Sequence, residues 1–149
     1  MAILKVLSVP HPFLHKVAEP VGNINDDIRN TLDDMLETMY AEEGIGLAAP
    51  QVHLGLRMLV IDLQREDSRP YKIINPEVTW TSEELSSYQE GCLSVPEEYA
   101  DVERPAKAHI RYHDENGIEH LMKADGLLAT CIQHEIDHLE GKLFIDYLS

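Results

Sequence analysis

Apolar residues recur at the spacing of an α-helix in two stretches of the chain. The first stretch predicts a helix that begins after Asn25, a good N-cap residue, runs to about Glu42 and ends at Gly44. Its apolar stripe consists of Ile28, Leu32, Met35, Leu36 and Met39. The second stretch predicts a helix that begins near Asp125, with Gly141 just past its end as a natural stop. Its buried stripe consists of Leu128, Ile132, Ile136 and Leu139.

Short runs of apolar or alternating residues predict β-strands elsewhere. We expect strands over residues 3–9, 57–63, 71–75, 77–81, 107–113 and 118–123. Asn75-Pro76 marks a break between two of these strands, and Glu115-Asn116-Gly117 is a strong hairpin turn between the last two. Residues 82–89 are polar and typical of a sheet edge, and residues 142–149 resemble a closing strand.

Length and charge narrow the classes of protein that this sequence can specify. At 149 residues the chain is expected to fold as one domain over residues 1–149. Its net charge of -15 argues against a nucleic-acid-binding surface, because phosphate groups would be repelled. The N-terminus lacks the apolar run of a signal peptide, and no stretch approaches the roughly 20 apolar residues that span a bilayer. We therefore expect a soluble cytoplasmic protein, without a membrane partner, in which Cys92 and Cys131 do not form a disulfide.

The second predicted helix carries a pattern that is typical of metal sites. His134 and His138 are one helical turn apart and project from the same face, with Glu135 beside them. Two imidazoles at this spacing can bind one metal ion, and Glu135 is free to transfer a proton. A surface helix that happens to carry two histidines is the alternative interpretation. A third ligand elsewhere in the chain would decide between them.

Cys92, in the segment Glu90–Pro96, is the candidate for that third ligand. One thiolate and two imidazoles leave a fourth coordination position open for water, as in catalytic rather than structural zinc sites. A divalent ion would lower the pKa of that water, and Glu135 is placed to accept its proton. Gln51 and the backbone N–H of Leu93 are candidate donors to an oxyanion. A buried, inert cysteine is the alternative interpretation of Cys92.

Two further observations bear on this site. Cys131 lies on the helix that already carries both histidines, so its side chain is expected to line a pocket wall rather than bind the metal. The stretch Gly44-Ile-Gly-Leu-Ala-Ala-Pro-Gln51 is rich in small residues that allow close approach of another group. This stretch is either a tight structural turn or a segment that contacts a ligand.

Three stretches together resemble the signature motifs of the peptide deformylase family. They are Gly44-Ile-Gly-Leu-Ala-Ala-Pro-Gln51, Glu90-Gly-Cys-Leu-Ser94 and Gln133-His-Glu-Ile-Asp-His138. They follow the order and separations of the family, and the similarity extends over the whole chain. A single short motif would be weak evidence, whereas three in order are highly specific.

The resemblance implies both a fold and an activity. It implies an α+β fold in which antiparallel β-sheets surround a central helix that carries the His-Glu-x-x-His motif, with one N-terminal helix. It also implies a hydrolase that removes the formyl group from the N-terminal formylmethionine of newly made polypeptides. Cys92, His134 and His138 would bind the metal, and Glu135 would be the acid and base. Gln51 and the Leu93 amide would hold the oxyanion.

The resemblance also implies a metal and a set of substrate contacts. Ferrous iron is the expected native ion, and Zn²⁺, Ni²⁺ or Co²⁺ can occupy such a site, because thiolate and imidazole ligands suit all of these. The substrate would lie along Gly46, and an uncharged pocket would take the methionine side chain. The residues expected to contact substrate are Gly46, Ile45, Glu90, Gly91, Tyr88, Leu127 and Cys131.

Partners and competing functions complete these expectations. Family members of the best-known bacterial type continue into a further C-terminal helix that can contact the ribosome. This sequence ends at Ser149, so the ribosome is a weaker expectation as a partner than the formylmethionyl peptide. We expect a monomer. The alternatives are another metal-dependent amidase or peptidase, which Cys92 disfavours, and a non-catalytic metal-binding relative, which the presence of Glu135 and Gln51 disfavours.

Overall fold

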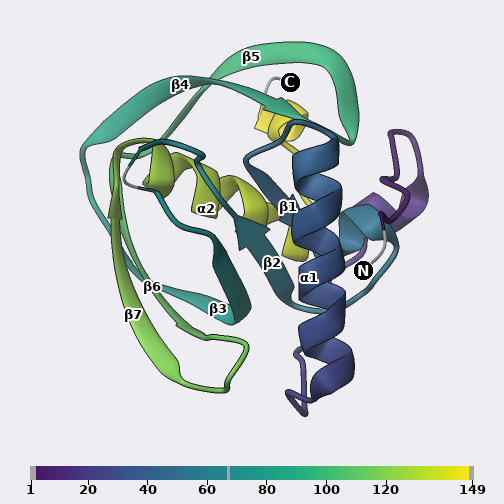
Figure 1. Cartoon of the computed structure of the whole chain (residues 1–149). Helices are drawn as coiled ribbons and strands as arrows, with labels where there is room; N and C mark the ends of the chain where they lie inside the picture. Colours follow the sequence, from purple (N-terminus) through teal and green to yellow (C-terminus); the bar gives the residue numbers. More distant parts are fainter. Residues whose placement is uncertain (1–2, 67, 148–149) are drawn as a thin grey trace.

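The computed structural model of the chain describes residues 3–66 and 68–147, and it has an α+β architecture (Figure 1). Its helices are α1 (Asp26–Ala41) and α2 (Gly126–Leu139), with 3-10 turns η1 (Pro12–His15), η2 (Ala49–Val52) and η3 (Phe144–Tyr147). Its strands are β1 (Gly46–Ala48), β2 (Met58–Ile61), β3 (Tyr71–Thr81), β4 (Leu85–Cys92), β5 (Val95–Pro105), β6 (Lys107–His113) and β7 (Glu119–Asp125). Neighbouring strands pair antiparallel, in a five-stranded sheet of order β1-β2-β3-β6-β7 and a two-stranded sheet β4-β5. This arrangement confirms the predicted fold class.

Strand β2 is buried on both faces because each face is covered by a different helix. Leu59 and Ile61 belong to the core cluster that contains the apolar stripe of α2. Met58 and Val60 belong to the cluster that contains the stripe of α1. Successive side chains of a strand point to opposite faces, so an unbroken apolar run fits a strand between two helices. Figure 1 shows α1 and α2 on either side of this part of the sheet.

Both predicted helices are confirmed, with their stripes in the core. Asn25 caps α1 by accepting a hydrogen bond from the backbone N–H of Ile28 at 3.1 Å. The Gly44 N–H closes the end of α1 on the carbonyl of Met39. Asp125 occupies the N-cap position of α2, and Gly141 follows the helix with a φ of 77°. A Cβ at Gly141 would lie 2.5 Å from the carbonyl oxygen of His15. The glycine that follows α2 therefore also leaves room for the N-terminal segment.

The hairpin of β6 and β7 agrees with the prediction, whereas the strand predictions for residues 3–9 and 142–149 are wrong. Residues 3–9 form no strand, although the N–H of Leu7 donates to the carbonyl of Gln51. The polar stretch 82–89 contains most of β4, which is an edge strand as expected. Its partner β5 is a strand that the sequence did not indicate. Within residues 142–149, Phe144–Tyr147 forms a 3-10 turn instead of a strand, and residues 148–149 lie outside the described residues.

The predicted break at Asn75-Pro76 is a β-bulge inside one strand, β3, rather than a boundary between two strands. Asn75 has a φ of 52°, which disrupts the register with β6 between Ile74 and Glu77. Its side chain accepts a hydrogen bond from the Val21 N–H at 2.8 Å and donates one to the Val21 carbonyl at 2.9 Å. The bulge therefore ties the chain before α1 to the sheet.

Among the described residues, neither helix is long and apolar enough to cross a membrane.

The bulge yields a stability prediction. We expect Asn75→Ala to lower the free energy of unfolding by about 2–4 kcal/mol, because alanine loses both bonds to Val21 and disfavours a positive φ. Asn75→Gly relieves the backbone conformation and should cost about 1 kcal/mol less than alanine. Urea denaturation measures both changes. The control Asn116→Ala, in an exposed turn, should stay within about 0.5 kcal/mol of wild type. An Asn75→Ala protein as stable as this control would contradict the role of the bulge.

Candidate metal centre

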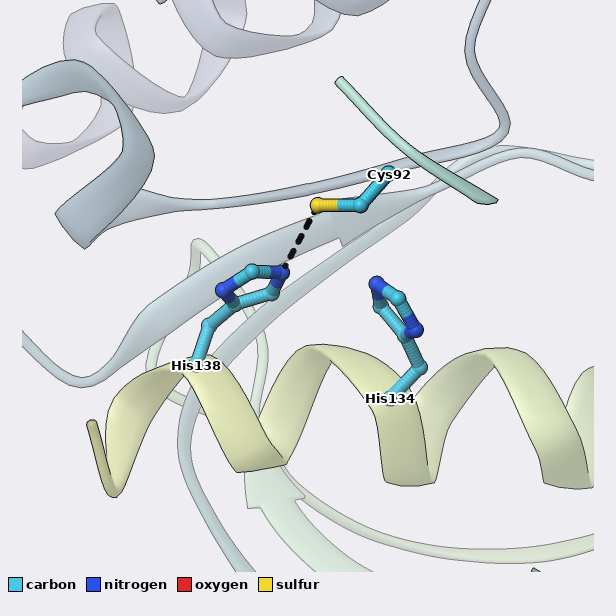
Figure 2. A group of neighbouring side chains, drawn as sticks. All are labelled: Cys92, His134 and His138. Atoms are coloured by element: carbon cyan, nitrogen blue, oxygen red, sulfur yellow. Dashed lines mark hydrogen bonds between the residues drawn. The ribbon is translucent and has the colours of Figure 1, made fainter. Parts of the chain in front are cut away.

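Helix α2 and the end of β4 bring together one cysteine and two histidines (Figure 2). His134 and His138 extend from the same side of α2 toward Cys92. The ligand atoms of the three residues all lie within 4.8 Å of one another, and Cys92 Sγ is 3.3 Å from His138 Nε2. Both histidines are buried and Cys92 is half-buried. The predicted set of three metal ligands is thereby confirmed as a cluster, assembled from two segments that are distant in the sequence.

A buried ion network orients His134 within the cluster. Its Nδ1 lies 2.9 Å from Glu90 Oε1, which leaves Nε2 to face the other two ligands. Arg104 donates to both oxygens of Glu90, at 2.7 and 3.0 Å, and to Asp137 at 2.8 Å. Burial alone would raise the pKa of Glu90, but the bonds from His134 and Arg104 hold it below its usual value. Glu90 therefore stays ionised and fixes the ring of His134.

The electrostatics of the cluster favour a bound cation. Burial opposes a charge on His134, yet Cys92, Glu135 and Glu90 outweigh it and raise the pKa of His134 to about 10. Surroundings that attract a proton this strongly also attract a divalent ion. Burial lowers the pKa of His138 well below its usual value, so this ring presents a neutral lone pair. A soft sulfur and two imidazole nitrogens are the donors that zinc, iron, nickel and cobalt accept, so the residues present fit such an ion.

Glu135 lies next to the cluster, and one of its carboxylate oxygens has no hydrogen-bond partner among the described residues. Oε2 is 4.0 Å from His134 Nε2, and Oε1 has no hydrogen-bond partner among the described residues. Burial raises the pKa of Glu135 to about 7. Strand β1 passes so close that a Cβ on Gly46 would lie 2.5 Å from Glu135 Oε2, and only glycine permits this approach. Glu135 is therefore a buried carboxyl group between the metal cluster and an edge strand.

Gln51 presents its amide nitrogen to the cluster in one fixed orientation. Its Oε1 accepts a hydrogen bond from the Ala48 N–H at 2.9 Å, which identifies the other end as the NH₂ group. That Nε2 lies 3.5 Å from Cys92 Sγ and 3.1 Å from Ser94 Oγ. Gln51 is buried, and the small-residue stretch 44–51 that carries it contributes to the site rather than forming only a turn.

A cleft of about 670 Å³ opens over the cluster. The N-terminal segment, the end of α1 and the turn between β4 and β5 form its walls. Among the residues that the sequence singled out, those that line it are Ile45, Gly46, Gln51, Gly91, Cys92, Leu93, His134 and Glu135. Because β1 is the edge strand of the five-stranded sheet, its backbone borders this cleft and can pair with an extended chain.

A second, smaller space of about 90 Å³, which we call the inner cavity, lies between α2 and strand β4. Its lining consists of Ile45, Gln89, Glu90, Gly91, Leu127, Thr130, Cys131, His134 and Glu135. Cys131 lines this cavity and is absent from the metal cluster, as the sequence predicted. Thr130 was missed, although it lies three residues after Leu127 and four before His134, a spacing that places all three on one helical face.

The expected contact of Tyr88 with this cavity stays a prediction, whereas the expected absence of charge from its walls is wrong. Tyr88 is not among the described residues that line it, and its hydroxyl group instead lies 3.8 Å from the position of a Cβ on Gly126. The walls are not free of charge, because Glu90 and Glu135 contribute to them. Glu90 is compensated by Arg104, a residue that no local sequence signal connects with the motif helix. Its part in the site depends on the pairing of β4 with β5, which the sequence did not indicate.

Comparison with known proteins supports the resemblance to the peptide deformylase family over the whole chain. The sequence model of the polypeptide deformylase family matches residues 3–149. The peptide deformylase of Phenylobacterium zucineum is 53% identical over 151 residues, covering 100% of this chain and 89% of that protein. The peptide deformylase of Azotobacter vinelandii is 54% identical over 149 residues, again with 100% and 89% coverage.

Solved structures of deformylases have the same fold. The crystal structure of the enzyme from Ehrlichia chaffeensis has a TM-score of 0.97 at 42% identity, covering 99% of this chain and 89% of that one. The same enzyme in complex with actinonin also gives 0.97, at 43% identity, with 100% and 90% coverage. With the Cys92, His134 and His138 cluster beside the cleft and this similarity along its full length, the chain belongs to the peptide deformylase family.

Proposed function

We propose that this protein is a peptide deformylase that removes the formyl group from N-terminal formylmethionine of newly made polypeptides and releases formate. The observation that carries the proposal is the cluster of Cys92, His134 and His138 beside the buried Glu135, at the base of a cleft bordered by an edge strand. An edge strand suits an extended peptide, and a metal site beside a free carboxyl group suits amide hydrolysis. Since the relatives named above are bacterial, we place the reaction in the cytoplasm of a bacterial-type cell.

The metal would be held by Cys92, His134 and His138. A divalent ion at this position lowers the pKa of a bound water molecule and polarises a carbonyl oxygen. We propose Fe²⁺ as the native ion, with Zn²⁺, Ni²⁺ and Co²⁺ as alternatives that the same donors accept. Glu90 and Arg104 hold His134 in the orientation that directs Nε2 toward the cluster.

Glu135 would accept a proton from the attacking water and deliver it to the amine that leaves. Its pKa of about 7, raised by burial, is close to neutral pH, where a group can act as both base and acid. Its free Oε1 faces no competing donor among the described residues, so it is available to water. The close approach of β1 at Gly46 places the carboxyl group beside the strand along which the substrate would lie.

The Gln51 amide and the Leu93 backbone N–H would stabilise the negative charge that develops on the formyl oxygen. Gln51 is suited to this role because the bond from Ala48 fixes its NH₂ group toward the cluster before the substrate binds. A donor that is already oriented costs no reorganisation during the reaction. Ile45, Leu127 and Cys131 in the inner cavity would hold the methionine side chain, with Gly46, Glu90 and Gly91 along the substrate. Contact of Tyr88 with this side chain stays a prediction.

The first functional test concerns the base. We expect Glu135→Gln to keep the metal and to lose about 10²–10⁴-fold in turnover, because the amide cannot accept the proton. Formate release from a formyl-Met peptide and metal analysis are measured on one anaerobic preparation. Glu140→Gln, an exposed carboxylate just past α2, is the control and should keep both. A Glu135→Gln protein with bound metal and turnover within a few-fold of wild type would remove Glu135 from the mechanism.

A second test separates the two cysteines. Cys92→Ser should lose most of its bound metal, because a weakly acidic hydroxyl group replaces a soft thiolate at a ligand position. Cys131→Ser should keep its metal, since Cys131 lines the inner cavity and lies outside the cluster. Metal per chain after dialysis is the measurement. Equal metal loss in the two variants would mean that the third ligand is not Cys92.

A third test concerns the first residue of the substrate. Peptides with formyl-Met and formyl-norleucine should have similar kcat/KM, whereas formyl-Asp should be far slower, because its carboxylate would be desolvated near Glu90 and Glu135. Leu127→Trp should lower kcat/KM for formyl-Met more than for formyl-Ala, since only the longer side chain reaches that position. An equal decrease for both peptides would show that Leu127 does not contact the substrate.

A further inference from the structure

The connection between α1 and β1 lies between the cleft and the segment that follows β2. Residues 42–45 of this connection line the cleft. Asp62 and Gln64, which follow β2, form hydrogen bonds with it and with Tyr40 near the end of α1. All three of these residues are described, and none of them lines the cleft. The connection is therefore held by groups that are separate from the proposed substrate site.

The side chain of Gln64 binds a backbone carbonyl of the connection. Its Nε2 donates to the Gly44 carbonyl at 2.9 Å, and the next carbonyl, that of Ile45, accepts the backbone N–H of Asp62 at 2.9 Å. Successive carbonyls of a regular strand point to opposite sides, whereas these two bind the same segment. The chain accordingly bends at Ile45, and the bond from Gln64 stabilises this bend.

The bend sets the direction of the backbone at Gly46, the first residue of β1. Gly46 lies opposite Ile61 of β2, and its neighbour Ile45 bonds to the N–H that follows β2. Hydrogen bonds in an antiparallel pair alternate along the strand, so the N–H and C=O of Gly46 point away from β2. They face the free edge of the five-stranded sheet, where an extended peptide can pair with them.

The same connection contacts the turn that carries a proposed oxyanion donor. A Cβ at Gly44 would lie 3.1 Å from Leu93 Cδ1, so the leucine side chain packs directly on this residue. The backbone N–H of Leu93 is one of the two donors proposed above. A shift of Gly44 would therefore disturb this turn as well as the strand edge.

Gln64 is held in an uncommon backbone conformation by its neighbour Asp62. Its φ of 57° lies in the left-handed region, which few residues other than glycine adopt. Asp62 Oδ1 stabilises this turn by accepting the Gln64 N–H at 2.9 Å, and its Oδ2 accepts the Tyr40 hydroxyl. Burial and the bond to Asp62 raise the pKa of Tyr40 to about 12, so the hydroxyl keeps its proton and donates it at neutral pH.

We propose that Tyr40, Asp62 and Gln64, which we call the β1 clamp, position the strand edge to which the substrate backbone binds. This inference rests on the proposed function, because that edge is taken as the peptide site. The three residues act through Gly44 and Ile45, so they are positioning residues. They should affect the affinity for the peptide more than the chemical step.

The main variant is Gln64→Glu, which keeps the shape of the side chain and replaces its NH₂ donor with a carboxylate oxygen. With formyl-Met-Ala-Ser as substrate, we expect KM to rise about 3–10-fold, because the net effect of one hydrogen bond is of this size. The value of kcat should change less than about 2-fold, since no reacting group is altered. A merely structural role would lower the midpoint of thermal unfolding and leave KM unchanged.

Arg65→Gln is the matched control. It makes the same change of one unit in net charge in the same loop and leaves the bond to Gly44 in place, so KM should equal that of the wild type. Tyr40→Phe is a second variant of the clamp, in which only the bond to Asp62 is lost. It should raise KM in the same direction as Gln64→Glu, by a smaller factor.

Amide hydrogen exchange of the metal-loaded protein without peptide tests the position of the strand edge directly. Peptides that cover residues 43–48 should exchange faster in Gln64→Glu than in the wild type, and at the wild-type rate in Arg65→Gln. Unchanged exchange, or an unchanged KM despite faster exchange, would overturn the proposal. Absence of formate release from formyl-Met-Ala-Ser by the wild type would contradict the proposed function instead, while hydrogen exchange would still report on the clamp.

Discussion

A buried arginine, Arg104, joins the β4–β5 hairpin to α2 through ion pairs with Glu90 and Asp137. The side chains of Arg104 and Glu90 are only 5% and 4% exposed, so neither charge is solvated by bulk water. Loss of either partner would leave the other charge buried and unpaired, at a cost of about 3–5 kcal/mol. Since Glu90 also holds His134, and Cys92 lies two residues after Glu90, this network fixes the distance between the thiol and the imidazoles.

The Arg104 network borders one side of the site, and strand β1 of the five-stranded sheet closely approaches it from another. Helix α2 packs its apolar stripe against the sheet and directs its polar face toward β4. Strand β1 approaches Glu135 because Gly46 has no side chain. A carboxyl group with a pKa near 7, a fixed amide donor from Gln51 and an open strand edge are thereby held around one metal position. These groups are held in place before a substrate binds, which is the preorganisation that hydrolysis of an amide requires.

The features of the fold that the sequence predicted are those with local causes. The two helices follow from stripes with a period of 3.6 residues and from Asn25, Asp125 and Gly141 at their ends. The β6–β7 hairpin follows from alternating residues around a strong turn. The sequence does not indicate strand β5, because its residues are largely polar and it pairs only with β4. Asn75-Pro76 predicts a break instead of a bulge, because a bulge and a strand boundary share the same local signal.

At the site, the sequence by itself determined which residues are the candidates for the chemistry. Cys92, His134 and His138 are chemically distinctive, and helical spacing together with three motifs in order is sufficient to select them with Glu135 and Gln51. Only the tertiary structure decided what surrounds them. The salt bridge of Arg104 and the charged part of the inner cavity depend on which strand pairs with which. Such contacts join residues far apart in the chain, and hydrophobic periodicity describes only near neighbours.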